Sequence, residues 1–196
     1  MSTDIPPPGP TQDLPVTDTD RIYDLVDDHT DILDLPLPVV KTAIDLFRGT
    51  YERASLAGRG SMIGVAAAVR VSCQMRGVAR SLDEIAAVTD SDPTLIAREA
   101  KKIEDMTDKH TTPVPPESFV EHWGQNLGID QDTRQKATEL LADVRPERAP
   151  SAAAAGTLWS VLADNDESDV TQDSVVQETH TSAYTLREVR NDVMAE

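Results

Sequence analysis

Apolar residues recur every three to four positions from about residue 21 onward, the spacing typical of amphipathic helices. In the first predicted helix, Ile22, Leu25 and Val26 share one face. Pro38 suits the first turn of a second helix, which ends before Gly58–Gly60. The apolar positions of this second helix are Val39, Ala43, Leu46, Phe47 and Tyr51. The pattern therefore predicts an all-α fold.

The stretch from Met62 to Cys73 is apolar nearly all the way round, which is typical of a helix buried among other helices. Ser81 is followed three residues later by Glu84, and this spacing predicts a capping box at the start of a short helix over Leu82–Val88. A further helix is predicted from Pro93 to about residue 106.

The second half of the chain follows the same plan. Helices are predicted over about 119–127 and 131–144, a small-residue helix follows from residue 150, and two more begin near Thr171 and Ser182. Equivalent positions lie 90 residues apart, and the pairs are Ser81 and Thr171, Asp83 and Asp173, Ile85 and Val175, Thr89 and Thr179, and Ile96 and Leu186. Chance similarity between alanine-rich helices is the alternative. The shared caps and turn spacing favour two copies of a five-helix unit with a buried third helix.

The helical pattern and the repeat divide the chain into three parts. Residues 1–20 form a proline-rich, acidic tail with little to bury, which we expect to be disordered. Residues 21–112 form the first repeat, and residues 113–196 form the second.

Composition excludes several classes of protein. No run of about 18 apolar residues is present to span a membrane, and the first ten residues lack the layout of a secretory signal. We therefore expect a cytoplasmic protein. The one cysteine, Cys73, allows no internal disulfide or cysteine-based zinc site, and the four histidines lack metal-ligand spacing. No phosphate loop, nucleophile elbow or carboxylate pair indicates catalysis, so we expect neither an enzyme nor a cofactor.

The net charge of −17 argues against nucleic-acid binding when it is taken alone. Its distribution changes that interpretation: residues 1–34 hold nine acids and one base, whereas residues 35–112 hold ten acids and eleven bases. Aspartate outnumbers glutamate and lysine is scarce beside arginine, which suggests a high-salt cytoplasm where charges are strongly screened. An ordinary acidic protein without a nucleic-acid role is the alternative.

Two segments resemble the core domain of archaeal transcription factor B. The more specific comprises Gly64-Val65-Ala66-Ala67-Ala68, Cys73, Gly77-Val78 and Arg80–Val88, and it is similar to the third and fourth helices of that family's first cyclin-like repeat. In the second half, Thr171-Gln172 and Thr185-Leu186-Arg187 resemble the family's helix-turn-helix. His180 stands where a glycine is common, at some cost in backbone strain.

This resemblance implies two tandem five-helix cyclin-like repeats, the second ending in a helix-turn-helix. It implies a transcription initiation factor that binds promoter double-stranded DNA together with a TATA-binding protein, with a recognition helix in the major groove. The family's zinc ribbon and the segment that enters the polymerase cleft have no counterpart in this sequence. We therefore expect a regulator or paralogue that meets RNA polymerase only indirectly.

Arg187 and Arg190 are the first candidates for DNA contact, because an arginine on a recognition helix can bind guanine through two hydrogen bonds. Pairing with Glu188, Asp192 or other nearby acids is the alternative. At the start of the same helix, Ser182 and Thr185 can contact phosphates or base edges, or can serve as a cap and a packing residue. For Ser182 capping is the favoured role.

Arg98, Lys101 and Lys102 form a basic stripe on the corresponding helix of the first repeat, which suits phosphate contact. Glu104 and Asp105 follow immediately, so internal ion pairs are the competing interpretation. Two functions remain: a promoter-binding factor, or a cyclin-fold protein–protein interaction module without DNA binding.

Overall fold

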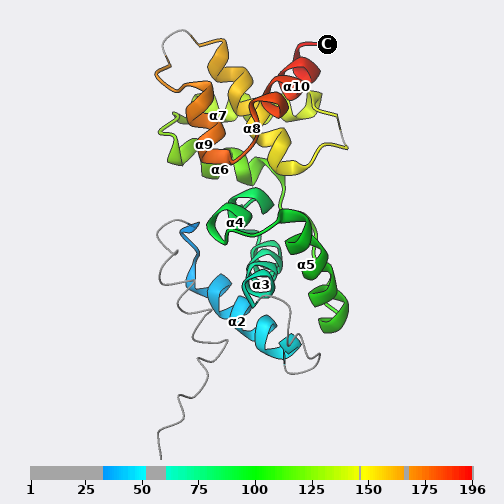
Figure 1. Ribbon diagram of the computed structural model, residues 1–196. Coiled ribbons are helices and arrows are strands. Elements are labelled where there is room, and N and C mark those ends of the chain that lie inside the picture. The colour runs from blue at the N-terminus through cyan, green and yellow to red at the C-terminus, as the bar shows by residue number, and fades with distance from the viewer. Residues whose placement is uncertain (1–32, 52–60, 146, 166–167, 196) are drawn as a thin grey trace, which may run out of the picture.

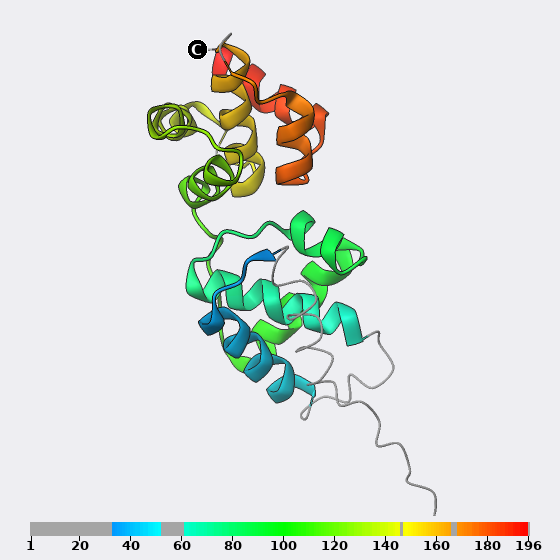
Figure 2. The ribbon, with the colours of Figure 1, turned by 90° about the vertical axis from the view of Figure 1, so that its left-hand side faces the viewer.

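The computed structural model describes residues 33–51, 61–145, 147–165 and 168–195. These residues form helices and connecting segments in two groups that are stacked end to end and joined by one connection (Figures 1 and 2). The first group contains α2 (Leu37–Tyr51), α3 (Ser61–Arg76), α4 (Leu82–Val88) and α5 (Pro93–Thr107). The second contains α6 (Pro116–Asn126), α7 (Gln131–Glu139), the 3₁₀ helix η1 (Leu140–Asp143), α8 (Pro150–Ala163), α9 (Gln172–Thr179) and α10 (Ala183–Met194).

The predicted tail over 1–20 and the predicted helix from residue 21 lie outside the described residues, as does Gly58–Gly60. The all-α prediction is confirmed for the part of the chain that the structure describes, since every regular element there is helical.

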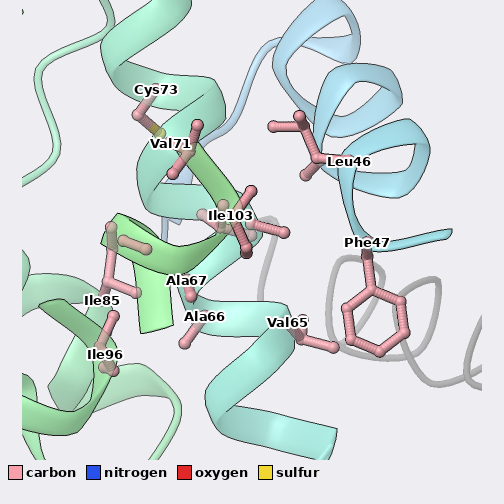
Figure 3. Close-up of a cluster of buried hydrophobic side chains, with 14 of the residues drawn as sticks. Leu46, Phe47, Val65, Ala66, Ala67, Val71, Cys73, Ile85, Ile96 and Ile103 are labelled. Atoms are coloured by element: carbon pink, nitrogen blue, oxygen red, sulfur yellow. The ribbon is translucent and has the colours of Figure 1, made fainter. Parts of the chain in front are cut away.

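Helix α3 is the centre of the first group, as its apolar sequence predicts. It packs against both α2 and α5, and its residues Val65, Ala66, Ala67, Ala68 and Val69 are all buried, so their small side chains let neighbouring helices approach closely (Figure 3). At Gly64 a β-carbon would lie 3.0 Å from the ring of Phe47, so a glycine is what admits this aromatic side chain.

The predicted capping box is confirmed at the start of α4. The Ser81 hydroxyl accepts a hydrogen bond from the Glu84 backbone N–H at 3.0 Å, and the Glu84 carboxylate accepts one from the Ser81 N–H at 2.5 Å. Helix α5 is capped by Asp92 with Pro93 in its first turn, which the sequence predicted from the proline alone.

The second group is built around α8, whose residues 153–158 are all buried and which packs against α6, α7 and α10. The helix predicted over 131–144 is wrong at its end, because the α-helix stops at Glu139 and tightens into η1. The chain stays helical to Asp143, but its last turn has the tighter 3₁₀ geometry that is common at the C-terminal ends of α-helices.

The predicted 90-residue offset recurs in the described helices. Ile85 and Val175 are fully buried, and Thr89 and Thr179 each donate a hydroxyl hydrogen bond of 2.8 Å to the carbonyls of these two residues. In both groups the following residue has left-handed backbone, with φ of 46° at Asp90 and 52° at His180. The match therefore extends to backbone conformation, which chance similarity of alanine-rich helices does not explain.

The left-handed backbone at His180 gives a stability prediction. A side chain other than glycine is strained in this conformation, so we expect His180→Gly to raise the free energy of unfolding by about 0.5–1 kcal/mol, after the entropy cost of the added glycine. Urea unfolding followed by circular dichroism measures the change. The control is Gln177→Gly on the exposed face of α9, which we expect to cost about 1 kcal/mol. A loss in His180→Gly equal to that of the control would contradict the strain.

Candidate nucleic-acid interface

Helices α9 and α10 are joined by the short turn His180–Ser182, and both begin at hydroxyl caps. Thr171 accepts a hydrogen bond from the Ser174 backbone N–H at 3.2 Å, and Ser182 accepts one from the Thr185 N–H at 3.1 Å. The hydroxyls of Ser182 and Thr185 also lie 3.0 Å apart. The favoured capping role of Ser182 is thus confirmed, and contact of either hydroxyl with DNA remains a prediction.

Helix α10 has one buried face and one exposed face. Leu186 and Val189 are fully buried, whereas Tyr184 (65 % exposed), Arg187 and Asn191 point outward at positions i, i+3 and i+7. Within the described residues, none of these three side chains has a hydrogen-bond or ion-pair partner. We call them the α10 stripe. Arg187 was predicted from the sequence, whereas Tyr184 and Asn191 were not, although their spacing from the buried Leu186 identifies them as exposed.

Arg190 does not lie on this stripe. It is half-buried, and its guanidinium Nη2 forms an ion pair of 2.5 Å with Oδ1 of Asp164, the residue that follows α8. Asp192, which the sequence offered as a partner for Arg187 or Arg190, is instead bound by Arg145 at 2.7 Å and by Arg148 at 2.8 Å. The alternative prediction of an ion pair is therefore correct for Arg190, although its partner is Asp164 and not Glu188 or Asp192. It is wrong for Arg187, which has no ion-pair partner among the described residues.

The basic stripe of α5 is largely neutralised. Lys101 lies 3.2 Å from Asp105 and 3.8 Å from Glu104, as the competing interpretation predicted. Lys102 pairs at 2.6 Å with Glu99, an acid on the same helix that the sequence analysis did not consider. Arg98 is exposed, and no described residue pairs with it. Of the three cations predicted to contact phosphates from α5, Arg98 is therefore the one that has no partner among the described residues.

The described residues contain no reactive thiol, metal-binding cluster or membrane-spanning helix. Cys73 is buried in α3, and burial raises the pKa of its thiol to about 12, so it stays protonated, as expected of a core residue. Among the described side chains, no group of histidine, cysteine and carboxylates is arranged to hold a metal ion. Nor do the described helices include one long and apolar enough to cross a membrane.

The two groups of helices meet at a side-chain cluster formed by Glu84 of α4 with His122 and Trp123 of α6. The indole N–H of Trp123, a fully buried residue of α6, donates a hydrogen bond of 3.2 Å to Oε1 of Glu84 in α4. His122 lies beside it, with Nε2 3.8 Å from the same oxygen. Burial raises the pKa of Glu84, while its hydrogen bonds from Ser81 and Trp123 oppose that shift.

His122 makes the protein sensitive to acid. Burial, reinforced by the charge of Arg80 and opposed by Asp34, lowers the pKa of His122 to about 4. In the unfolded chain a histidine takes up a proton near pH 6.5, so the folded state loses relative stability as the pH falls from about 6.5 towards 4. The free energy of unfolding should therefore fall between pH 7 and pH 4.5 in the parent chain. In His122→Gln, which lacks the histidine, we expect this fall to be smaller by about 2–3 kcal/mol.

Urea unfolding of both proteins at the two pH values measures this difference, because the remaining titratable groups contribute similarly to each. Glu84, whose pKa is raised by burial, contributes the opposite slope in both proteins. An identical drop in the two proteins would show that His122 is not held neutral.

The fold described so far is that of an all-helical, cyclin-like repeat protein. Residues 19–105 match the family model described as the transcription factor TFIIB repeat. The chain is 31 % identical over 169 residues to transcription initiation factor IIB 6 of Halobacterium salinarum, covering 83 % of this chain and 52 % of that protein. It is 27 % identical over 161 residues to transcription initiation factor IIB 2 of Thermococcus kodakarensis, covering 79 % and 52 %.

A third relative is transcription initiation factor IIB 2 of Haloferax volcanii, at 29 % identity over 168 residues, with 83 % of this chain and 50 % of that protein covered. These alignments are longer than the segment matched by the repeat model. The chain therefore carries a TFIIB repeat over residues 19–105 and is similar over most of its length to transcription factors of the TFIIB family, which are not enzymes. It spans about half the length of these relatives.

Proposed function

We propose that this TFIIB-like chain binds promoter DNA through the exposed face of α10, together with a TATA-binding protein. The observation that carries the proposal is the α10 stripe, Tyr184, Arg187 and Asn191, whose side chains have no hydrogen-bond or ion-pair partner among the described residues and lie on the second of two helices joined by a short turn. Arginine and asparagine are the side chains that bind guanine and adenine edges through paired hydrogen bonds. Tyrosine adds a hydroxyl for phosphate or sugar contact.

The charge distribution supports a requirement for a protein partner. The chain has a net charge of −17, and two of the three cations on the stripe of α5 are paired with acids. Few phosphates can then be neutralised, so counterion release contributes little and affinity for DNA alone is weak. A TATA-binding protein, the partner implied by the resemblance to archaeal transcription factor B, would supply a second contact and a bent DNA.

A gel-shift titration of a promoter fragment in concentrated potassium chloride, with and without the TATA-binding protein, tests this function. The expected result is weak binding to DNA alone and a ternary complex that forms cooperatively when the partner is present. Equal affinity with and without the TATA-binding protein would overturn the cooperative function.

The pairing of Lys101 and Lys102 favours a second candidate, a protein–protein interaction module without DNA binding. Arg98→Glu distinguishes the two candidates with little risk to folding, since Arg98 is exposed and unpaired among the described residues. Weaker promoter binding in this variant favours the first function. A folded parent chain that forms no ternary complex at all favours the second.

A further inference from the structure

Glu84 joins two structural elements through one carboxylate. Its Oε2 accepts a hydrogen bond of 2.5 Å from the Ser81 backbone N–H and closes the capping box of α4. Its Oε1 accepts the 3.2 Å hydrogen bond from the indole N–H of Trp123 in α6. Because both oxygens are engaged and the side chain is buried, the carboxylate is held in one position.

The segment that carries this carboxylate is itself anchored. Arg80, which is buried, donates hydrogen bonds from its guanidinium to the backbone carbonyls of Leu33, Asp34 and Ala79. Helix α4 lies at the end of the first group that faces the second group (Figure 1), and this anchored segment holds its Glu84 carboxylate at the junction.

The remaining contacts at this junction are less directional. Ala79 packs into the apolar cluster of the second group with Val114 and Phe119, and apolar contact alone tolerates sliding and rotation. Thr111, in the connection, is tied back to Gln74 at 3.1 Å and to Glu104, which are both in the first group. Among the described residues, the bond from Trp123 to Glu84 is the direct hydrogen bond between α6 and the first group.

We infer that Glu84 is a positioning residue, which fixes the orientation of the second group of helices on the first through its hydrogen bond with Trp123. A hydrogen bond is directional and weakens steeply when it is misaligned, so this bond selects one rotation of α6 against α4. One consequence rests on the proposed function: the same bond would set α10 relative to α5, so that both meet one DNA duplex. The orientation itself does not depend on that function.

The test is a distance measurement between spin labels on the free protein by pulsed electron paramagnetic resonance. Labels attached at Ala97→Cys in α5 and Ala142→Cys in η1 use two exposed alanines, one in each group, and leave the buried Cys73 in place. The parent chain should give a single narrow distance distribution. Trp123→Phe, which removes the indole N–H but leaves the capping box, should lose the narrow peak.

Ser81→Ala is the matched control. It removes the hydroxyl that caps α4 and leaves the bond between Glu84 and Trp123, so it should lower the melting temperature and keep the narrow peak. Glu84→Ala provides a second test if Trp123→Phe fails to fold, and it should lose the narrow peak as Trp123→Phe does. A narrow peak retained in a folded Glu84→Ala or Trp123→Phe chain would overturn the inference, whether or not the protein binds DNA.

Discussion

Replacing Gly156 by alanine is expected to destabilise the second group of helices by about 3 kcal/mol, although alanine is the better helix former. A β-carbon at this position of α8 would overlap Val189 of α10, both at its β-carbon and at its γ-methyl groups. No rotamer of Val189 removes an overlap with its own β-carbon, so the two helices would have to separate. The intrinsic gain of about 1 kcal/mol for glycine to alanine in a helix is too small to offset this.

Gly49→Ala is the matched control, because Gly49 lies in α2 and a β-carbon there would come within 4 Å of no atom of another described element. At this position the helix propensity should appear alone, as a gain of up to about 1 kcal/mol. Urea unfolding followed by circular dichroism gives both values. Adding Val189→Ala to Gly156→Ala should recover part of the loss. A stabilised Gly156→Ala chain would show that α8 and α10 do not pack as closely as described.

Truncation of Leu186 is the second large effect, with an expected cost of about 3 kcal/mol. Leu186 is fully buried in the core of the second group, and alanine there would leave a cavity. Its counterpart at the 90-residue offset, Ile96, is also fully buried and sits in the core of the first group. Because the two positions are structurally equivalent, Ile96→Ala should cost a similar amount.

The surface control for this pair is Leu95→Ala, since Leu95 is 40 % exposed and its truncation should change stability by less than about 0.5 kcal/mol. The three variants can be compared by the same unfolding experiment. Costs for Leu186→Ala or Ile96→Ala no larger than that of Leu95→Ala would contradict the assigned cores.

Much of the fold could be predicted from the sequence because its signals are local. The capping box at Ser81, the proline at position 93 and the all-round apolar α3 depend on neighbouring residues, and the structure has each where it was predicted. The end of α7 at Glu139 was missed because the change from α-helix to the 3₁₀ turn Leu140–Asp143 carries no capping residue or proline at that point of the sequence.

The candidate site was harder to predict because ion pairs depend on which helices become neighbours. Asp164 and Arg190 are 26 positions apart in sequence, and only the packing of α8 against α10 brings them together. The hydrogen bond between Glu84 and Trp123 could not be predicted for the same reason. The capping box accounts for Glu84 within its own helix, and nothing in the sequence indicates that an indole 39 residues away will contact it. Tyr184 and Asn191 required no such contact, and the periodicity of α10 could have identified them.

The most direct test of promoter binding by α10 compares Arg187→Ala with Arg190→Ala in ternary complex titrations with promoter DNA and the TATA-binding protein. Arg187 is exposed and unpaired within the described chain, whereas Arg190 is held by Asp164, so the two arginines of one helix provide a matched pair. Arg187→Ala should weaken the complex by about 10- to 100-fold, and Arg190→Ala should bind nearly as the parent chain does. Parental affinity in a folded Arg187→Ala chain, or an equal loss in both variants, would contradict DNA contact through the α10 stripe.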